Sequence, residues 1–191
     1  INHPEKSLIM RKTSNDVLDR LDQNSFCEAN KIPVVVILDN IRSQSNIGSF
    51  FRTCDAFRIE ELILCGITAT PPHREIQKTA LGATETVAWR YSPDTVEVID
   101  ELRGKGYLII GVEQAEPHQD LLVHEFDLSR PTALIFGNEV DGISDEVMNC
   151  VDFALEIPQS GTKHSLNVAV SGGILLWETY KQYRMKNKNW R

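Results

Sequence analysis

Residues 34–54, VVVILDNIRSQSNIGSFFRTC, contain the two patterns that decide the fold. The stretch opens with five consecutive β-branched or aliphatic residues, Val34 to Leu38, which match a strand in length and are apolar on both faces. Four apolar residues then recur at the i, i+3, i+4 and i+7 spacing of a helix: Ile47, Phe50, Phe51 and Cys54. A strand buried on both faces and followed by an amphipathic helix indicates a parallel sheet covered by helices.

The same alternation continues along the chain. Apolar runs of strand length recur at residues 62–65, 107–112, 132–136 and 153–157. Between them, three residues repeat the helical spacing before Gly104 interrupts it: Val96, Ile99 and Leu102. We therefore predict an α/β fold, a parallel sheet flanked by helices. Ligands of such sheets bind beyond the carboxyl ends of the strands, so functional residues are expected in the loops that follow strands.

The length and composition fit one domain with an N-terminal extension. The chain has 191 residues, of which 41% are apolar, enough for one substantial core and too few for two catalytic domains. Residues 1–32 are predicted to form a short helical extension, with a few apolar residues among many charges: Val17, Leu18, Leu21 and Phe26. No apolar run approaches the roughly 20 residues that span a bilayer. We expect a cytoplasmic protein that does not bind membranes.

The four cysteines are widely scattered, at Cys27, Cys54, Cys65 and Cys150. Zinc sites and redox motifs use close pairs of cysteines, which this sequence lacks. We therefore predict buried free thiols in a reducing compartment, and no metal site.

The charge restricts how the protein could bind nucleic acid. A net charge of -7 argues against binding RNA with the whole surface, because neutralising phosphates requires cations. An RNA site would have to be local. One candidate is a set of scattered cations: Arg42, Arg52, Arg58, Arg74, Lys78 and Arg90. The other is the tail, which has no acidic residue after Glu178 but carries five cations: Lys181, Arg184, Lys186, Lys188 and Arg191. The tail could equally be a solvated end.

The loop after the first strand carries three candidate residues. We expect Asn46 to be the N-cap of the next helix, and Gly48 to allow close backbone approach in its first turn. Arg52, expected in the second turn, can present a planar fork of donors to a phosphate or hydroxyl. Taken alone, Arg52 also fits a surface ion pair and Asn46 a simple cap.

The loop at residues 137–144, GNEVDGIS, follows another predicted strand. It is not a phosphate-binding P-loop, because Ile143 and Ser144 replace the lysine and hydroxyl that should follow the second glycine. Its acidic turn suits a cationic or hydroxyl-bearing ligand, although an ordinary turn would look similar. Ser144 is expected to cap the following helix.

A third loop, residues 156–167, leads into a helix whose first turns are small and apolar. A helix cap at Ser165 followed by a buried helix would explain that serine. It would not explain a cluster of small residues that allows close backbone approach: Gly161, Asn167, Gly172 and Gly173.

Together, these loops resemble the three motifs of the SpoU branch of the SPOUT RNA methyltransferases, also called the TrmH family. The matching residues are Asn46-x-Gly48-x-x-x-Arg52 with Asp55-Ala56-Phe57, then Phe136-Gly137-Asn138-Glu139-x-x-Gly142-Ile143-Ser144, then Ile157-Pro158-x-x-Gly161-x-x-x-Ser165-Leu166-Asn167-Val168. The resemblance covers residues 33–180, which leaves the extension at 1–32 and the basic tail at 181–191 outside it. The sequence departs from the commonest family pattern at Gln159, Ser160 and the pair Gly172-Gly173.

The resemblance implies a C-terminal trefoil knot in the α/β fold, which is a rare exception to the rule against knots. It also implies a site for S-adenosyl-L-methionine, with the adenosine against Gly137, Ile157 and Leu166. Family members dimerise through the knot region, and the arginine of one subunit lies near the donor of the other. Residues 168–176 are therefore expected in an apolar homodimer interface.

The implied activity is methyl transfer to a ribose 2′-hydroxyl of tRNA or rRNA without a metal. Arg52 corresponds to the catalytic arginine, and four residues would hold it, the ribose and the loops: Asn46, Glu139, Ser165 and Asn167. A guanidinium has a pKa above about 12, so orienting the hydroxyl and stabilising a developing alkoxide is easier for Arg52 than removing a proton. RNA contacts are expected at three cations: Arg42, Arg74 and Lys163.

Three alternatives differ in activity. A SPOUT enzyme that methylates a base nitrogen would share the fold and donor, but the set of Asn46, Arg52 and Asn167 favours the ribose. A catalytically silent RNA-binding protein could retain the same fold, although intact motifs argue against it. A nucleotide-using α/β enzyme is disfavoured because the sequence has neither a P-loop nor a Gly-x-Gly-x-x-Gly fingerprint.

Overall fold

The computed structural model describes residues 12–14, 17–18 and 20–187. In these residues, seven strands form one sheet in the order β3-β2-β1-β6-β4-β7-β5, and every neighbouring pair is parallel. The strands are β1 (Ile32–Asp39), β2 (Ile59–Cys65), β3 (Trp89–Ser92), β4 (Leu108–Val112), β5 (His118–Asp120), β6 (Thr132–Phe136) and β7 (Phe153–Glu156). The predicted parallel sheet is confirmed, and β3 and β5 are additional strands at its two edges.

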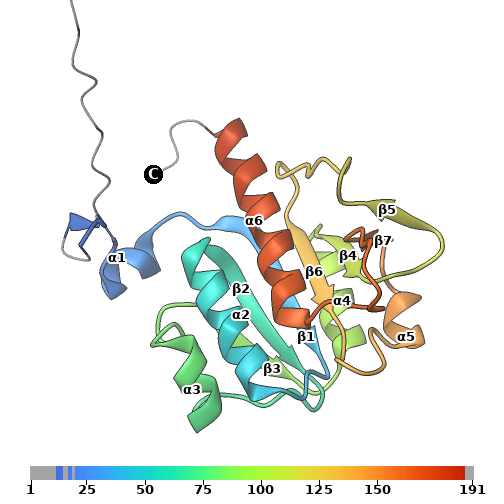
Figure 1. Ribbon diagram of the computed structural model, residues 1–191, viewed down its shortest axis with the longest axis horizontal. Coiled ribbons are helices and arrows are strands. Elements are labelled where there is room, and N and C mark those ends of the chain that lie inside the picture. The colour runs from blue at the N-terminus through green and yellow to red at the C-terminus, as the bar shows by residue number, and fades with distance from the viewer. Residues whose placement is uncertain (1–11, 15–16, 19, 188–191) are drawn as a thin grey trace, which may run out of the picture.

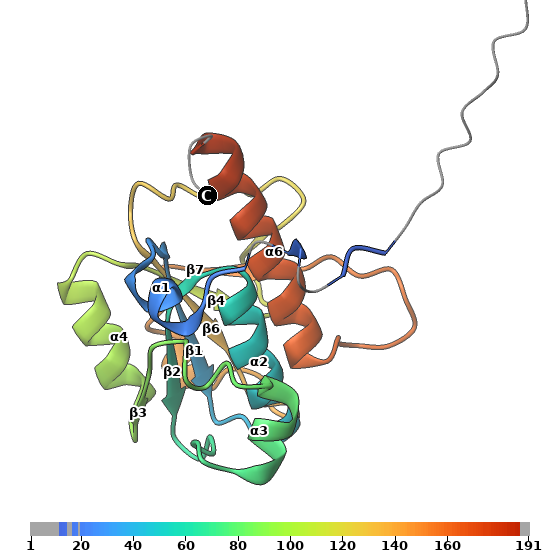
Figure 2. The ribbon, with the colours of Figure 1, turned by 90° about the vertical axis from the view of Figure 1, so that its left-hand side faces the viewer.

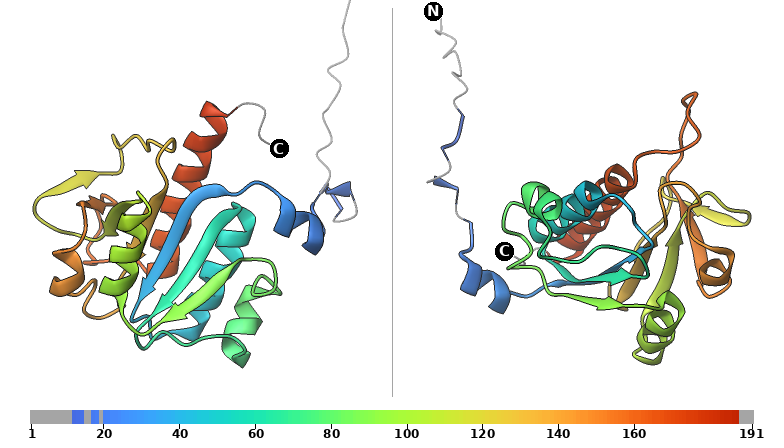
Figure 3. Two further views of the ribbon diagram at one scale, coloured as in Figure 1. Left: turned by 180° about the vertical axis from the view of Figure 1, so that it is seen from behind. Right: turned by 90° about the horizontal axis from the view of Figure 1, so that it is seen from below.

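Helices cover both faces of the sheet (Figures 1 and 3). They are α1 (Gln23–Glu28), α2 (Gln44–Ala56), α3 (Arg74–Ala80), α4 (Thr95–Gly104), α5 (Asp145–Met148) and α6 (Val168–Lys186). Helices α2, α3 and α6 contribute to the apolar core on one face, and α4 and α5 to the core on the other. The alternation of strand and helix thus produces the expected three layers.

Strand β1 lies near the middle of the sheet and divides its side chains between the two cores. Val34, Val36 and Leu38 point into the core with α2 and α6, while Val35 and Ile37 point into the core with α4. All five are at most 1% exposed. The unbroken apolar run is therefore explained by burial on both faces.

Two glycines let helices approach closely. A Cβ on Gly172 of α6 would lie 2.3 Å from the ring of Phe50 on α2, which itself packs 5.0 Å from the ring of Phe136. A Cβ on Gly48 would lie 2.0 Å from Thr79 Oγ1 on α3. The close approach predicted at Gly48 is confirmed, and it is made to α3. A Cβ on Gly161 or Gly173 would meet no atom within 4 Å, so neither glycine shows the close approach that the sequence predicted there.

The described part of the N-terminal extension contains one short helix, α1. Phe26 is its buried residue and lies under the Lys31 ammonium, whereas Val17 and Leu21 are 69% and 43% exposed. The Gln23 side chain donates to the carbonyl of Glu85 at 3.2 Å, which attaches α1 beside the segment before β3.

Two expectations near the termini and at the cysteines need correction. Cys54 and Cys65 are buried as predicted, but Cys27 is exposed and Cys150 is only half-buried. Helix α6 continues to Lys186, so the basic segment that starts at residue 181 begins inside this helix. Lys188 and Arg191 lie outside the described residues.

Among the described residues, none of the helices has both the length and the apolar character to cross a membrane.

Candidate active site

Three neighbouring strands, β6, β4 and β7, end at a cavity of about 510 Å³. Residues after each strand line it, together with the start of α6: Val112, Glu113, Gln114, Phe136, Gly137, Asn138, Glu139, Val140, Asp141, Gly142, Leu155, Ile157, Gln159, Ser165, Leu166, Asn167, Val168 and Ser171. The cavity is thus at the carboxyl edge of the sheet, where the sequence predicted it.

The loop after β6 is a tight turn that exposes backbone to the cavity. Asn138 and Gly142 form an antiparallel bridge, and Gly142 has a φ of 70°. A Cβ on Gly137 would lie 2.2 Å from the carbonyl carbon of Gly142, so the turn excludes a side chain there. The Asn138 amide donates to the carbonyl of Asn40 at 2.9 Å and thereby attaches this turn to the loop after β1.

Glu139 holds the loop after β1. Its carboxylate accepts the backbone N–H groups of Arg42 and Ser43 and the side-chain amide of Asn46, each at 3.0 Å. Burial by itself raises the pKa of Glu139, but these donors outweigh burial and lower the pKa below its usual value. Glu139 is therefore a charged clamp between two of the three motifs.

Asn46 and Asn167 extend this clamp to the third motif. Asn167 Nδ2 donates to Asn46 Oδ1 at 3.2 Å, while Asn46 Nδ2 donates to Glu139. Asn167 is the N-cap of α6 and accepts the N–H groups of Ala169 and Val170. Three residues that are distant in sequence thus form a continuous hydrogen-bonded relay.

The capping prediction at Asn46 is wrong, and the alternative interpretation of Ser165 as a helix cap does not hold either. The N-cap of α2 is Ser43, whose hydroxyl accepts the N–H of Asn46, so Asn46 lies inside the first turn and its side chain is available to the relay. The cap of α6 is Asn167 rather than Ser165, which lines the cavity. Ser144 caps α5 as predicted, by accepting the N–H of Val147.

Arg52 lies away from the cavity of its own chain. Because α2 begins at Gln44, Arg52 is in the third turn rather than the second, and its side chain is exposed. It is not among the residues that line the cavity. A single chain therefore brings together Asn46, Glu139, Ser165 and Asn167, but not Arg52.

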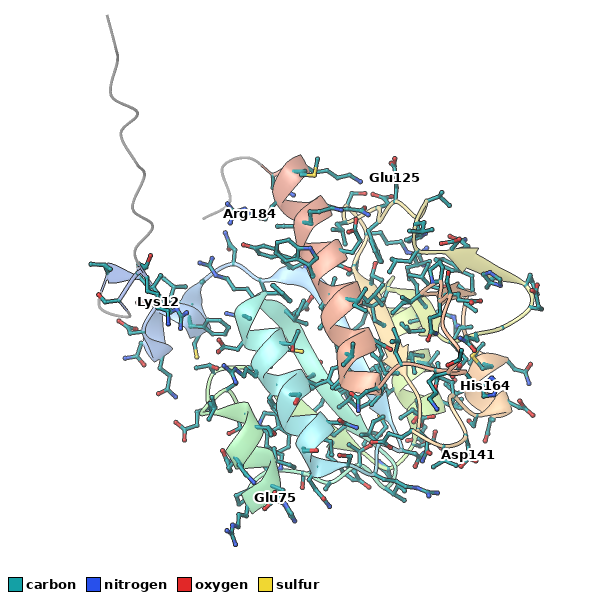
Figure 4. The ribbon with its side chains drawn as sticks, viewed as in Figure 1. Lys12, Glu75, Glu125, Asp141, His164 and Arg184 are labelled. Carbon is teal, nitrogen blue, oxygen red and sulfur yellow. The ribbon has the colours of Figure 1, made fainter. Side chains whose placement is uncertain are left out.

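The residues expected to hold the adenosine and the RNA occupy different places. Gly137, Ile157 and Leu166 all line the cavity, and Leu166 is 37% exposed. The residues expected to contact RNA are exposed and do not line it: Arg42, Arg74 and Lys163. Lys163 lies on the loop before α6, which projects from the body of the protein (Figure 2). Figure 4 shows Asp141, a cavity residue, at the opposite end of the molecule from Arg184, which lies near the end of α6.

Asp39 fixes the base of the first loop. This last residue of β1 is only 2% exposed, and its carboxylate accepts the Thr95 hydroxyl at 2.6 Å and the Asn40 amide at 3.0 Å. Burial raises the pKa of Asp39 above its usual value, although the hydrogen bonds oppose that shift. The start of α4 is thereby tied to the loop that leads into α2.

Glu113 is a cavity residue that the sequence analysis did not single out. It directly follows β4, and its Oε2 accepts the N–H of Ile143 at 3.1 Å while Oε1 accepts that of Gln114 at 2.9 Å. An acidic residue immediately after a buried strand was the available signal, since functional residues follow strands in such sheets.

The lining defines what the cavity can bind. Three carboxylates, Glu113, Glu139 and Asp141, line it, and none of its lining residues is Lys or Arg. The other lining residues comprise seven apolar side chains, six uncharged polar side chains and two glycines. Such a lining favours a ligand with cationic or hydroxyl groups over a polyphosphate. No group of His, Cys, Asp and Glu side chains in the described residues could hold a metal ion.

The fold and the site define an α/β protein with a cavity of small-molecule size at the carboxyl edge of a parallel sheet, lined in part by a glycine turn. The chain belongs to the SpoU rRNA Methylase family, whose sequence profile matches residues 33–177. This finding confirms the resemblance carried by the three motifs.

Named relatives are enzymes that modify RNA. The chain is 32% identical over 149 residues to the tRNA (guanosine(18)-2′-O)-methyltransferase of Thermus thermophilus, covering 78% of this chain and 75% of the relative. It is 32% identical over 173 residues to the 23S rRNA (guanosine-2′-O-)-methyltransferase RlmB of Neisseria meningitidis, covering 91% and 65%.

Solved structures share the fold. The TrmH/SpoU tRNA modifying enzyme of A. aeolicus matches with a TM-score of 0.76 and 26% identity, over 85% of this chain and 81% of that one. The SpoU methyltransferase AviRb of Streptomyces viridochromogenes, solved with AdoMet, matches with a TM-score of 0.73 and 26% identity, over 83% and 64%.

Proposed function

We propose that this protein transfers a methyl group from S-adenosyl-L-methionine to a ribose 2′-hydroxyl in tRNA or rRNA. The observation that carries the proposal is the relay of Glu139, Asn46 and Asn167, which joins the three family motifs beside the cavity. The named relatives are 2′-O-methyltransferases, which supports the ribose as the methylated group.

The cavity fits the proposed donor in size and chemistry. About 510 Å³ is within the usual range for a small-molecule site. Gly137 leaves the backbone bare, and Ile157 and Leu166 offer apolar contacts to an adenine ring. The cofactor supplies a methyl group already activated by its sulfonium. The protein therefore has to position that group and the hydroxyl rather than create a strong electrophile.

Arg52 is assigned to the hydroxyl. Its guanidinium stays protonated, so it would orient the 2′-hydroxyl and stabilise the alkoxide that develops during transfer. Asn46, Glu139, Ser165 and Asn167 would hold the loops around the reacting groups. Because Arg52 does not line the cavity of its own chain, it would act at the cavity of a partner subunit.

A homodimer through α6 would bring Arg52 to that cavity. Exposed apolar residues follow one face of α6 at helical spacing: Val170, Ile174 and Trp177, which are 50%, 39% and 51% exposed. Burying this stripe against a second copy is favourable, since exposed apolar patches mark interaction surfaces. Helices α2 and α6 pack side by side, so the stripe and Arg52 are on neighbouring elements (Figures 1 and 2).

The finer parts of the proposal follow from family membership. We assign a trefoil knot to the C-terminal segment. Residues 33–180 are assigned as the catalytic domain, and residues 1–32 as an accessory extension. RNA would contact Arg42, Arg74 and Lys163 outside the cavity, where their side chains are exposed. The protein is assigned to the cytoplasm, where tRNA and rRNA are available.

The experiment is methyl transfer in vitro with purified RNA. The protein is incubated with radiolabelled S-adenosyl-L-methionine and total tRNA or rRNA, and the labelled nucleosides are identified after complete digestion. The proposal expects label in a 2′-O-methyl nucleoside. Label in a base-methylated nucleoside would replace it with a base-nitrogen methyltransferase. The absence of both donor binding and transfer to either RNA would favour a silent RNA-binding protein.

A further inference from the structure

Glu113 lies between the two loops that the proposed function assigns to the adenosine. Val112, the last residue of β4, pairs with Phe136 of β6 on one side and Leu155 of β7 on the other. The residue after Val112 therefore sits between Gly137 and the segment that reaches Ile157. Glu113 is one of the residues that line the cavity.

The three cavity carboxylates differ in how many acceptor positions remain. Glu139 already accepts three N–H groups. Asp141 is 74% exposed and faces Arg42 at 3.9 Å. Glu113 accepts one N–H group on each oxygen, from Ile143 and Gln114. Since each carboxylate oxygen can accept two hydrogen bonds, one position remains on each oxygen of Glu113.

Within the described residues, no Lys, Arg or His forms an ion pair with the Glu113 carboxylate. A partly buried carboxylate with two open acceptor positions selects a ligand that offers hydrogen-bond donors.

We propose that Glu113 accepts hydrogen bonds from the two ribose hydroxyls of the methyl donor, which makes it a specificity-determining residue of the donor site. The inference rests on the proposed function. Two neighbouring hydroxyls match the two oxygens of one carboxylate, and acidic residues after strands bind ribose hydroxyls in this way in dinucleotide-binding sheets. The backbone N–H groups of Ile143 and Gln114 fix the carboxylate in advance, which reduces the entropy lost on binding.

The test combines one substitution with a change in the ligand. Glu113→Gln keeps one oxygen for the Ile143 N–H but loses the charge and the second acceptor. Calorimetric titrations use the full chain and three ligands: S-adenosylhomocysteine, its 2′-deoxyribose analogue and its 3′-deoxyribose analogue. Glu116→Gln is the matched control, because Glu116 is three residues away, 90% exposed and outside the cavity.

The wild type and Glu116→Gln are expected to bind S-adenosylhomocysteine at least tenfold more tightly than either analogue. Glu113→Gln is expected to lose about tenfold to hundredfold in affinity for S-adenosylhomocysteine, as for a lost hydrogen bond to a charged group, and to lose less for either analogue, which keeps only one of the two hydroxyls. The measured quantity is the dissociation constant, so methyl transfer is not needed.

Three outcomes would overturn the inference. Equal losses of affinity for all three ligands in Glu113→Gln would mean that Glu113 only supports the turn at Ile143. Unchanged affinity for S-adenosylhomocysteine would mean that the carboxylate does not contact it. Equal affinity of the wild type for the three ligands would exclude the contact even if the variant failed to fold. A wild type that binds none of them, with or without total tRNA, would instead remove the proposed function itself.

Discussion

The side-chain amide of Asn167, at the start of α6, donates a hydrogen bond to the side-chain oxygen of Asn46 on α2 across 3.2 Å. Asn46 in turn donates to Glu139 after β6, so one chain of hydrogen bonds crosses three loops. A polar network of this kind is stable only when its members are satisfied together. The position of each motif therefore depends on the other two.

Glu139→Gln is expected to destabilise the fold by about 1–3 kcal/mol at neutral pH, because the amide group would face backbone N–H donors that now bind a carboxylate oxygen. The pKa of Glu139 is lower in the folded protein than its usual value of 4.5. Its stabilising effect is therefore complete above about pH 4.5 and is lost as the pH falls through the lower folded value. Urea unfolding between pH 7 and pH 3 is expected to show the two proteins converging in acid.

The control is Glu125→Gln, since this glutamate is exposed and labelled far from the cavity in Figure 4. Its unfolding curve should follow the wild type at every pH. A difference between Glu139→Gln and the wild type that stayed constant down to pH 3 would argue against a charged clamp.

Arg52→Ala is expected to remove methyl transfer and leave donor binding nearly intact, because Arg52 lies outside the cavity. Single-turnover transfer measures the first property and calorimetric titration the second. Arg20→Ala, which removes an exposed arginine of the N-terminal extension, is the control. A variant that transferred methyl groups at the normal rate would refute the assignment of Arg52.

Gly172→Ala is expected to lower the free energy of unfolding by about 1–3 kcal/mol, because the added methyl group would overlap the buried ring of Phe50. Gly173→Ala is the matched control: the new Cβ meets no atom within 4 Å, and alanine in a helix is more stable than glycine by about 0.5–1 kcal/mol. Denaturant unfolding at one protein concentration compares them. Equal effects at both positions would contradict the close packing of α2 on α6.

Val170→Asp is expected to convert the proposed dimer to a monomer and to abolish transfer. The aspartate would bury a charge in the apolar stripe of α6, while its place near the helix N-terminus leaves the helix itself stable. Val123→Asp, at a valine that is 80% exposed on another loop, should remain dimeric. Analytical ultracentrifugation distinguishes the two results, and a Val170→Asp dimer would exclude this face as the interface.

The sequence predicted the centre of the sheet better than its edges. The apolar run of β1 is long because it is buried on both faces, and that signal is local. By contrast, β5 spans only His118–Asp120 and is largely exposed, and β3 mixes Trp89 and Tyr91 with polar residues. Edge strands this short and polar carry too few residues for a periodic pattern.

The sequence predicted which loops form the site. The predictions that were wrong concern residues whose hydrogen bonds join one loop to another. Ser43 and Asn46 are both good caps, so local propensity could not choose between them. The Glu139 carboxylate accepts hydrogen bonds from the backbone N–H of Ser43 and from the side-chain amide of Asn46. The bond to Asn46 joins residues that are 93 positions apart in the sequence. The hydrogen bond from the Ile143 N–H to Glu113 likewise joins residues that follow two different strands.

The most direct test of the donor site is calorimetric titration of the purified wild-type protein with S-adenosyl-L-methionine and, separately, S-adenosylhomocysteine. We expect saturable binding of each ligand near one molecule per subunit. If binding appears only after total tRNA is added, RNA completes the site, and the assignment of a methyl-donor site to this protein still holds. A well-folded protein that bound neither ligand, with or without tRNA, would contradict it.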